Sequence, residues 1–302
     1  MDFVCGGLAA SGASIFSNPF DVLKTRMQLQ GELQAKGEHA VHYKNVFHGA
    51  YVVAKNEGLA GLQKGLGVAM ILHGSRNFVR LGIYQTMENE GLLTDPHGRT
   101  ILYKSALASA FAGAAGAFVG SPLFLIKTQL QSQAAEQIAV GHQHGHRGAI
   151  RAIRSIYQQN GVFGLWRGVN GTMLRALAGS SSQLTTFALS KDKLKEIDIL
   201  QNSPLLTSLV ASIFSGLVQT VCINPFDVVS TRLFNQAVDA NGRGVLYSGV
   251  VDCFGKILKT EGFLGLYKGV VANYMRLAPH AMFCLLFWDI LKGWKLLYFE
   301  NR

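Results

Sequence analysis

Three long stretches without a charged residue constrain what this chain can fold into. They run from Phe3 to Phe20, from Ser105 to Ile126 and from Ile199 to Phe226. A helix needs about 20 mostly apolar residues to cross a bilayer, so the first stretch is at the lower limit and the other two exceed it. All three are rich in Gly, Ala and Ser, which let helices approach each other closely in lipid. They predict membrane-spanning helices rather than the core of a soluble protein.

The composition narrows the class further. Hydrophobic residues make up 49% of the chain and charged residues 15%, whereas a soluble protein carries about 25% charged residues. The apolar content excludes intrinsic disorder, and four isolated cysteines exclude a disulfide framework or a thiolate zinc site. The net charge is +10, but the basic residues form no stripe with interleaved aromatic residues. We therefore expect anionic lipid or anionic solutes as partners, and no nucleic acid.

An internal repeat organises these stretches. Pro19, Pro122 and Pro225 are each separated from the next by 103 residues. A cation followed by a glycine recurs after each proline, at Lys64-Gly65, Arg167-Gly168 and Lys268-Gly269. A period of this length that occurs twice indicates a tandem triplication. We predict repeats at residues 1–91, 102–195 and 204–297, which form one integral domain.

Each repeat is expected to contain a spanning helix, a break at the proline, an interfacial helix and a second spanning helix. Residues 149–157 illustrate the interfacial helix, because apolar residues recur at helical spacing with basic residues opposite. The second spanning helices are predicted at about 65–84, 168–189 and 269–288. The fold class is therefore an all-α membrane protein, with six transmembrane helices in three pseudo-threefold repeats and both termini on one side.

Cations in the second spanning helices need a reason to be there, because an arginine at bilayer depth costs roughly 2.5 to 3.5 kcal/mol. Steps of four residues keep side chains on one helical face, and such steps from each cation-glycine pair reach these positions: Leu72, Arg76, Arg80, Arg175, Gly179, Gln183, Arg276, His280 and Cys284. No acid lies in these helices at the same depths. The arginines could be neutralised internally only by diverting Asp21 or Asp227.

An anionic ligand completes such a cluster most simply, since guanidinium groups bind carboxylate, phosphate or sulfate oxygens in pairs. We expect Arg175, Arg276 and Arg80 to bind a small dianion. Further contacts are expected from Arg76, His73, His280 and Gln183.

Other chemistry has little support in the sequence. There is no nucleophile–base arrangement, phosphate-binding loop or dinucleotide motif, so an enzyme is not expected. The histidines at 142, 144 and 146 have no Cys or carboxylate beside them, and we interpret them as part of a solvated loop rather than a metal site. Asp2 stands where a presequence would carry a cation, which predicts that no cleavable presequence is present.

The segment Pro19-Phe20-Asp21-Val22-Leu23-Lys24-Thr25-Arg26-Met27-Gln28 resembles the signature P-x-[DE]-x-x-[KR]-x-[KR]-x-Q of the mitochondrial carrier (solute carrier 25) family. The resemblance covers the whole chain. Residues 17–21, 80–84 and 139–143 look like the branch of oxaloacetate/sulfate carriers and their animal relatives. It implies a multi-pass protein of the mitochondrial inner membrane, with the interfacial helices on the matrix side.

The family pairs the acid of each signature with the cation of the next when the matrix side is closed. Carried over, this predicts the pairs Asp21–Lys127 and Asp227–Lys24, beside helix kinks at Pro19, Pro122 and Pro225. Phe124 and Ser230 replace the acid and the cation of the third pair. Losing both partners of a buried ion pair leaves no unpaired charge and changes stability little, whereas losing one partner is strongly destabilising.

The resemblance also narrows the substrate. The family's contact points fall here on Leu72, on Arg175 with Ala176, and on Arg276. The residues at 175 and 176 disfavour a nucleotide or an amino acid, which leaves keto acids, dicarboxylates and inorganic oxoanions. We predict an antiporter of anions such as oxaloacetate, malonate, sulfate or thiosulfate.

Alternatives remain open at this point. One is a proton-coupled anion uniporter or an uncoupler-like leak, with His73 or His280 as the titrating group. Others are a carrier-fold adaptor that does not transport, and a soluble helical scaffold. The resemblance implies a monomer without a cofactor, and cardiolipin as a bound lipid at Gly65, Gly168 and Gly269.

Overall fold

Long helices dominate the computed structural model, which describes residues 2–34, 40–94, 101–146, 148–194, 204–239 and 242–299. The long helices are α1 (Asp2–Leu29), α3 (Leu66–Asn89), α4 (Leu102–Ser132), α6 (Val169–Leu194), α8 (Pro204–Asn235) and α10 (Val270–Phe299). Between them lie α2 (Val46–Glu57), α5 (Ala149–Gly164) and α9 (Val250–Thr260). The order long–short–long recurs three times, and no β-sheet is present in the described ranges. Residues 199–203 of the third charge-free stretch lie outside them.

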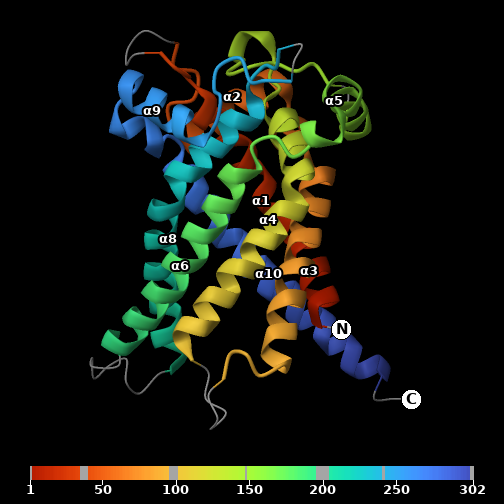
Figure 1. Ribbon diagram of the computed structural model, residues 1–302, viewed down its shortest axis with the longest axis vertical. Helices are drawn as coiled ribbons and strands as arrows, with labels where there is room; N and C mark the ends of the chain where they lie inside the picture. Colours follow the sequence, from red (N-terminus) through yellow and green to blue (C-terminus); the bar gives the residue numbers. More distant parts are fainter. Residues whose placement is uncertain are drawn as a thin grey trace.

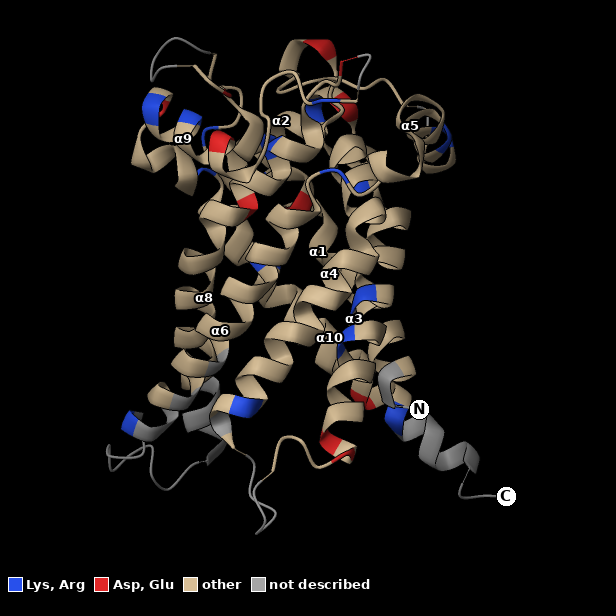
Figure 2. Cartoon of the chain, in the orientation of Figure 1, with Lys and Arg blue, Asp and Glu red and all other residues tan. Residues whose placement is uncertain are grey.

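The long helices form one bundle, and the short helices gather at one of its ends (Figure 1). We call this end, with α2, α5 and α9, the capped end. The long helices spread apart toward the opposite end, where the two termini lie. Charged residues concentrate at the capped end and at the far tips of the long helices (Figure 2). The segments between are mostly uncharged, as a bilayer requires.

Three helical segments in the described part of the chain are long and apolar enough to cross a membrane: Tyr103–Ser132, Val210–Asn235 and Phe263–Lys292. On α4, large side chains are exposed along one face at Tyr103, Leu107 and Phe111. Such a row suits contact with lipid, because exposed apolar surface of this kind is unfavourable in water.

Three hydrophobic clusters join the short helices to the bundle, one for each repeat. In the third repeat, Val229 and Leu233 of α8 pack with Cys253 and Ile257 of α9. The other clusters join α1 to α2 and α4 to α5 in the same way. Each short helix buries residues four apart, such as Ala152 and Ile156 of α5. The apolar face of each short helix therefore packs against the bundle, while its opposite face points outward.

The prolines do not end their helices, which corrects the predicted break. Pro19, Pro122 and Pro225 each stand inside a helix that continues to Leu29, Ser132 or Asn235. A proline inside a helix leaves the carbonyl four residues before it without its usual donor.

Side chains from the capped end fill this vacancy in two repeats. Gln63 Nε2 donates to the Ile15 carbonyl at 3.1 Å, and Trp166 Nε1 donates to the Phe118 carbonyl at 3.0 Å. Because these carbonyls lie four residues before Pro19 and Pro122, the freed backbone groups are satisfied, and the helix continues.

The backbone conformation explains why a glycine recurs after each cation. Gly65, Gly168 and Gly269 have φ angles of 72°, 79° and 72°, in the left-handed region that favours glycine. A Cβ added at Gly168 would meet the Phe234 ring at 3.0 Å. The cation-glycine pairs therefore mark a sharp turn into the second long helix, pressed against the next repeat.

Candidate functional site

Two buried ion pairs join α1, α4 and α8 near the capped end. Lys24 Nζ lies 2.6 Å from Asp227 Oδ2, and Lys127 Nζ pairs with Asp21 Oδ2. Gln28 Nε2 also donates to Asp227 Oδ2 at 3.0 Å. The structure thus brings together both predicted pairs, with all four charged side chains at most 4% exposed.

The third position of this ring carries no charge. Ser230 Oγ donates to the Phe226 carbonyl of its own helix at 2.6 Å. The Phe124 ring packs on the Phe234 ring, with centroids 5.3 Å apart. Apolar contact stands where the repeat would place a third ion pair.

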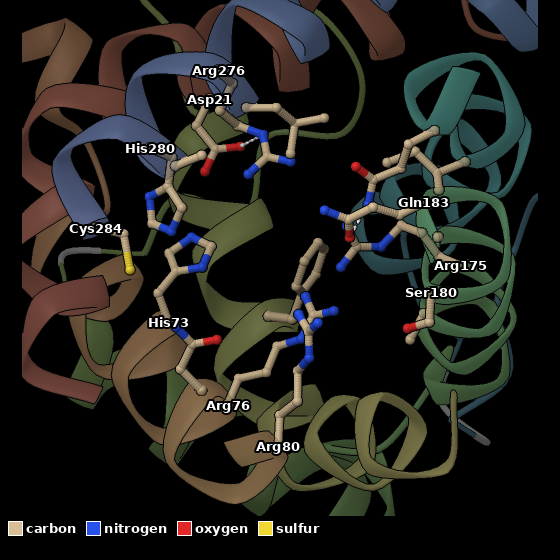
Figure 3. Close-up of a pocket in the computed structure, with 18 of the residues that line it drawn as sticks. Asp21, His73, Arg76, Arg80, Arg175, Ser180, Gln183, Arg276, His280 and Cys284 are labelled. Atoms are coloured by element: carbon tan, nitrogen blue, oxygen red, sulfur yellow. Dashed lines mark hydrogen bonds and ion pairs between the residues drawn. The ribbon is translucent and has the colours of Figure 1, made fainter. Parts of the chain in front are cut away.

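A cavity of about 380 Å³ begins at these ion pairs. Because α3 starts at the capped end, Arg76 and then Arg80 lie progressively farther from it. The predicted substrate contacts that line the cavity are His73, Arg76, Arg80, Arg175, Ala176, Gln183, Arg276 and His280. Figure 3 shows Arg276 and the two histidines on one side, Arg175 and Gln183 on the other, and Arg76 and Arg80 between them.

Leu72 is the predicted contact that the structure places elsewhere. It is buried in a hydrophobic cluster with Phe124 and is not among the described residues that line the cavity. A leucine at this depth has an apolar neighbour available, so it packs into the protein rather than facing the cavity.

The two deepest arginines reach toward the ion pairs. Arg175 Nη1 lies 3.5 Å from Asp227 Oδ1, and Arg276 Nε lies 3.6 Å from Asp21 Oδ1. Neither contact is a hydrogen bond, since Asp227 Oδ1 and the Nε atoms of both arginines have no hydrogen-bond partner in the described structure. Each carboxylate is thus held closely by a lysine and faced more loosely by an arginine.

This sharing follows the threefold repeat. Asp21 takes its lysine from the second repeat and its arginine from the third. Asp227 takes its lysine from the first and its arginine from the second. The corresponding third set is Phe124, Ser230 and Leu72, in which all three charges are missing. The sequence predicts that Asp21 or Asp227 must leave its lysine to neutralise an arginine, whereas in the structure each carboxylate keeps its lysine and also faces an arginine.

Two histidines lie next to each other in the wall of the cavity. The His73 ring on α3 and the His280 ring on α10 have centroids 4.9 Å apart. His280 Nδ1 and Ser17 Oγ are within 3.1 Å of each other. The pair lies beside Asp21 and Arg276 (Figure 3).

Several residues in the cavity were not predicted from the sequence, notably Asn77, Ser180 and Gln219, and Phe124 was predicted only as the replacement of a gate acid. Ser180 lies four residues after Ala176, so helical spacing could have found it. Gln219 belongs to a charge-free stretch, which gives no such signal, whereas the repeat puts Phe124 at the position of Asp21 and Asp227 and could have found it.

The histidine run at 142–146 is less solvated than predicted. His144 Nε2 lies 2.9 Å from the Asn235 carbonyl oxygen, and its partial burial lowers the pKa of its imidazole to about 4. Within the described residues, no three His, Cys, Asp or Glu side chains gather in a way that could hold a metal ion.

The family model described as "Mitochondrial carrier protein" matches residues 1–91, 99–198 and 201–298. The chain belongs to the mitochondrial carrier family. It is therefore a multi-pass transporter of the mitochondrial inner membrane rather than an enzyme, and the carrier fold gives it six membrane spans. In the family's orientation, the capped end is the matrix end.

Curated relatives align over nearly the whole chain. Solute carrier family 25 member 35 of Mus musculus is 47% identical over 97% of this chain and 98% of the relative. The mitochondrial oxaloacetate transport protein of Saccharomyces cerevisiae is 42% identical over 99% and 91%. The mitochondrial citrate transporter E of Aspergillus niger is 40% identical over 94% and 89%.

Proposed function

We propose that this carrier exchanges small dianions by alternating access around the central cavity. The favoured substrates are dicarboxylates such as oxaloacetate or malonate, and sulfur oxoanions such as sulfate or thiosulfate. The names of the relatives from Saccharomyces cerevisiae and Aspergillus niger support a carboxylate substrate.

The excess of cations in the cavity is the observation that carries this proposal. Six lysine and arginine side chains are among its described lining residues, against one carboxylate, Asp21. Arg175 and Arg276 face carboxylates that already hold a lysine. Their remaining N–H groups suit the paired oxygens of a dianion.

The ion pairs near the matrix end are proposed as the gate. A bound anion can shift the equilibrium between a closed and an open gate only if it binds the two states with different strength. Arg175 and Arg276 provide such a difference, since they face both the cavity and the gate carboxylates. Substrate bound to these arginines would weaken their contacts with the gate carboxylates, which help to hold the gate closed.

Exchange in liposomes tests the proposal. Vesicles loaded with unlabelled malonate or sulfate should take up labelled malonate, malate and sulfate but not ADP, and uptake should require the internal anion. Arg175→Ala should abolish uptake, whereas Arg154→Ala, at an exposed position of α5, should leave it unchanged. Uptake of ADP would contradict the assignment. No uptake by folded protein would favour an adaptor that does not transport.

Proton coupling is a second candidate, favoured by the contact between His73 and His280. Two imidazoles at the cavity wall could carry a proton with the anion. Uptake driven by a pH gradient without internal anion, and lost in His280→Asn, would support it. The same uptake at every pH would exclude it.

A further inference from the structure

The side chain at position 124 faces the substrate cavity where the carrier signature places an acid. Phe124 occupies, in the second repeat, the position that Asp21 and Asp227 hold in the first and third. Phe124 is 7% exposed and contributes to the cavity wall. It packs in one hydrophobic cluster with apolar side chains that include Phe234 and Leu72. The ring is therefore held from behind and presents its remaining surface to the cavity.

Two cations lie against this ring. The Arg175 guanidinium carbon is 4.9 Å from the ring centroid, and Lys127 Nζ is 5.2 Å from it. Both distances are within the range in which an aromatic face attracts a cation, and the attraction is stronger where water is sparse. Arg175 is 7% exposed, so the ring contributes to holding a buried charge in place.

An aromatic face and a carboxylate hold an arginine in different ways. A carboxylate accepts hydrogen bonds from the guanidinium fork and uses the donors that an anionic substrate needs. An aromatic ring attracts the cation through its face and leaves the N–H groups at the edge of the fork free. Consistent with this, Arg175 Nε has no hydrogen-bond partner in the described structure, and Arg175 Nη1 stays 3.5 Å from Asp227.

We propose that Phe124 is a positioning residue, which sets the affinity of the site for dianions by holding Arg175 over its ring with the hydrogen-bond donors free. This inference rests on the proposed function, because it assumes that Arg175 binds the substrate. Without the ring, Arg175 closes onto Asp227, and substrate has to compete with that carboxylate. With an acid at position 124, substrate competes with a second carboxylate beside Arg175 and Lys127.

Substitutions that separate ring from volume test this inference. Phe124→Leu should raise the KM for malonate about fivefold with Vmax within about twofold of wild type, the size expected from one cation–π contact. Phe124→Tyr, which keeps the ring, should restore the wild-type KM. Phe124→Asp should raise the KM further, by about tenfold or more. Phe111→Leu is the matched control, because Phe111 lies on the same helix and is 62% exposed.

Coupling to Arg175 distinguishes positioning from packing. In an Arg175→Gln background, Phe124→Leu should change malonate binding by less than about twofold, because the cation is gone. Binding is read from the thermal stabilisation of purified protein by malonate, so this cycle does not depend on transport. If the leucine variant does not fold, Phe124→Met takes its place.

The outcomes separate this inference from the proposed function. If wild-type protein neither takes up malonate nor is stabilised by it, the proposed function fails and this inference fails with it. If wild type binds malonate but Phe124→Leu binds it equally well, only the positioning role is overturned. The same conclusion follows if Phe124→Tyr is as impaired as Phe124→Leu, or if the leucine effect is equal in both backgrounds.

Discussion

Within each repeat, three positions at the matrix end connect the first long helix to the second, and the residues at these positions differ between repeats. We call this set of contacts the joint of the repeat. In the first repeat, Glu57 accepts hydrogen bonds from Arg26 at 2.7 and 2.9 Å and pairs with Lys64 at 2.6 Å. In the third, Glu261 binds Arg232 and Lys268 in the same way. Each glutamate ties the end of the first long helix to the start of the second.

The second repeat lacks this tie. Gln129 and Asn160 stand where the other repeats have arginine and glutamate, and only the cation Arg167 remains. Gln129 Nε2 donates to the Phe234 carbonyl at 3.2 Å, but Gln129 Oε1 and Arg167 Nε have no hydrogen-bond partner in the described structure. The matrix-end contacts of the second repeat are the least complete of the three.

The charges of the gate are absent as a complete set at one of its three positions, whereas the joint of the second repeat keeps one cation, Arg167, of its three charges. The gate lost an acid, a lysine and an arginine at Phe124, Ser230 and Leu72, and the joint lost an arginine and a glutamate at Gln129 and Asn160. One buried partner left alone costs several kcal/mol, whereas removal of both is nearly neutral. At the matrix end, the third gate position is therefore held by apolar packing, and the second repeat has no arginine–glutamate pair.

The largest loss of stability and transport is expected from removing the carboxylate of a gate position that has all its charges. Asp227→Asn leaves Lys24 and Arg175 without a carboxylate, so we expect a loss of about 3 to 5 kcal/mol in stability and no measurable exchange. Thermal unfolding in detergent and malonate exchange measure this. Asp252→Asn is the control, since the Asp252–Lys256 pair is partly exposed and a surface ion pair contributes little to stability. Equal effects of the two substitutions would contradict the comparison.

Giving the joint of the third repeat the residues of the second repeat is expected to cause a smaller net loss of stability than Asp227→Asn. Arg232→Gln and Glu261→Asn should each destabilise the protein by about 3 kcal/mol, because each leaves a buried partner unpaired. The double variant should lose clearly less than the sum of the two single losses, which a double-mutant cycle in thermal unfolding measures. Additive losses would show that the two side chains act independently.

The reverse conversion should stabilise the protein modestly. Gln129→Arg combined with Asn160→Glu gives the second repeat the residues of the first, and supplies a carboxylate for Arg167. We expect a gain of about 1 kcal/mol in unfolding experiments, and a loss for Asn160→Glu alone if the arginine is required. Destabilisation by the double variant would mean that the second joint is shaped for its uncharged residues.

The smallest effect concerns pH. Burial alone would raise the pKa of the Glu57 carboxyl, but the hydrogen bonds from Arg26 and Lys64 bring it below its usual value of 4.5. A lowered pKa means that the contribution of Glu57 is complete above pH 4.5 and is lost as the pH falls through the folded-state pKa. The difference in unfolding temperature between wild type and Glu57→Gln should therefore stay constant from pH 8 to about 5 and shrink only below that. A difference that shrinks between pH 8 and 6 would contradict this assignment.

Much of the fold and of the site could be predicted from residues one repeat apart. The pairs Asp21–Lys127 and Asp227–Lys24 form as the signature implied, and the interfacial helices lie between the long ones. The continuation of the helices past Pro19 and Pro122 could not be predicted. There Gln63 and Trp166 reach across from distant turns and donate to the freed carbonyls.

The threefold repeat, the spanning helices and the set of cations that need an anion can all be predicted from the amino-acid sequence alone. Those properties follow from local periodicity and from the cost of charge in lipid, which act on residues close together in the chain. The packing of the helices, in contrast, brings Arg175 and Arg276 to the carboxylates of the gate lysines, buries Leu72 and places Phe124 under Arg175. These contacts join different repeats or neighbouring helices, and their geometry depends on how the helices pack against one another.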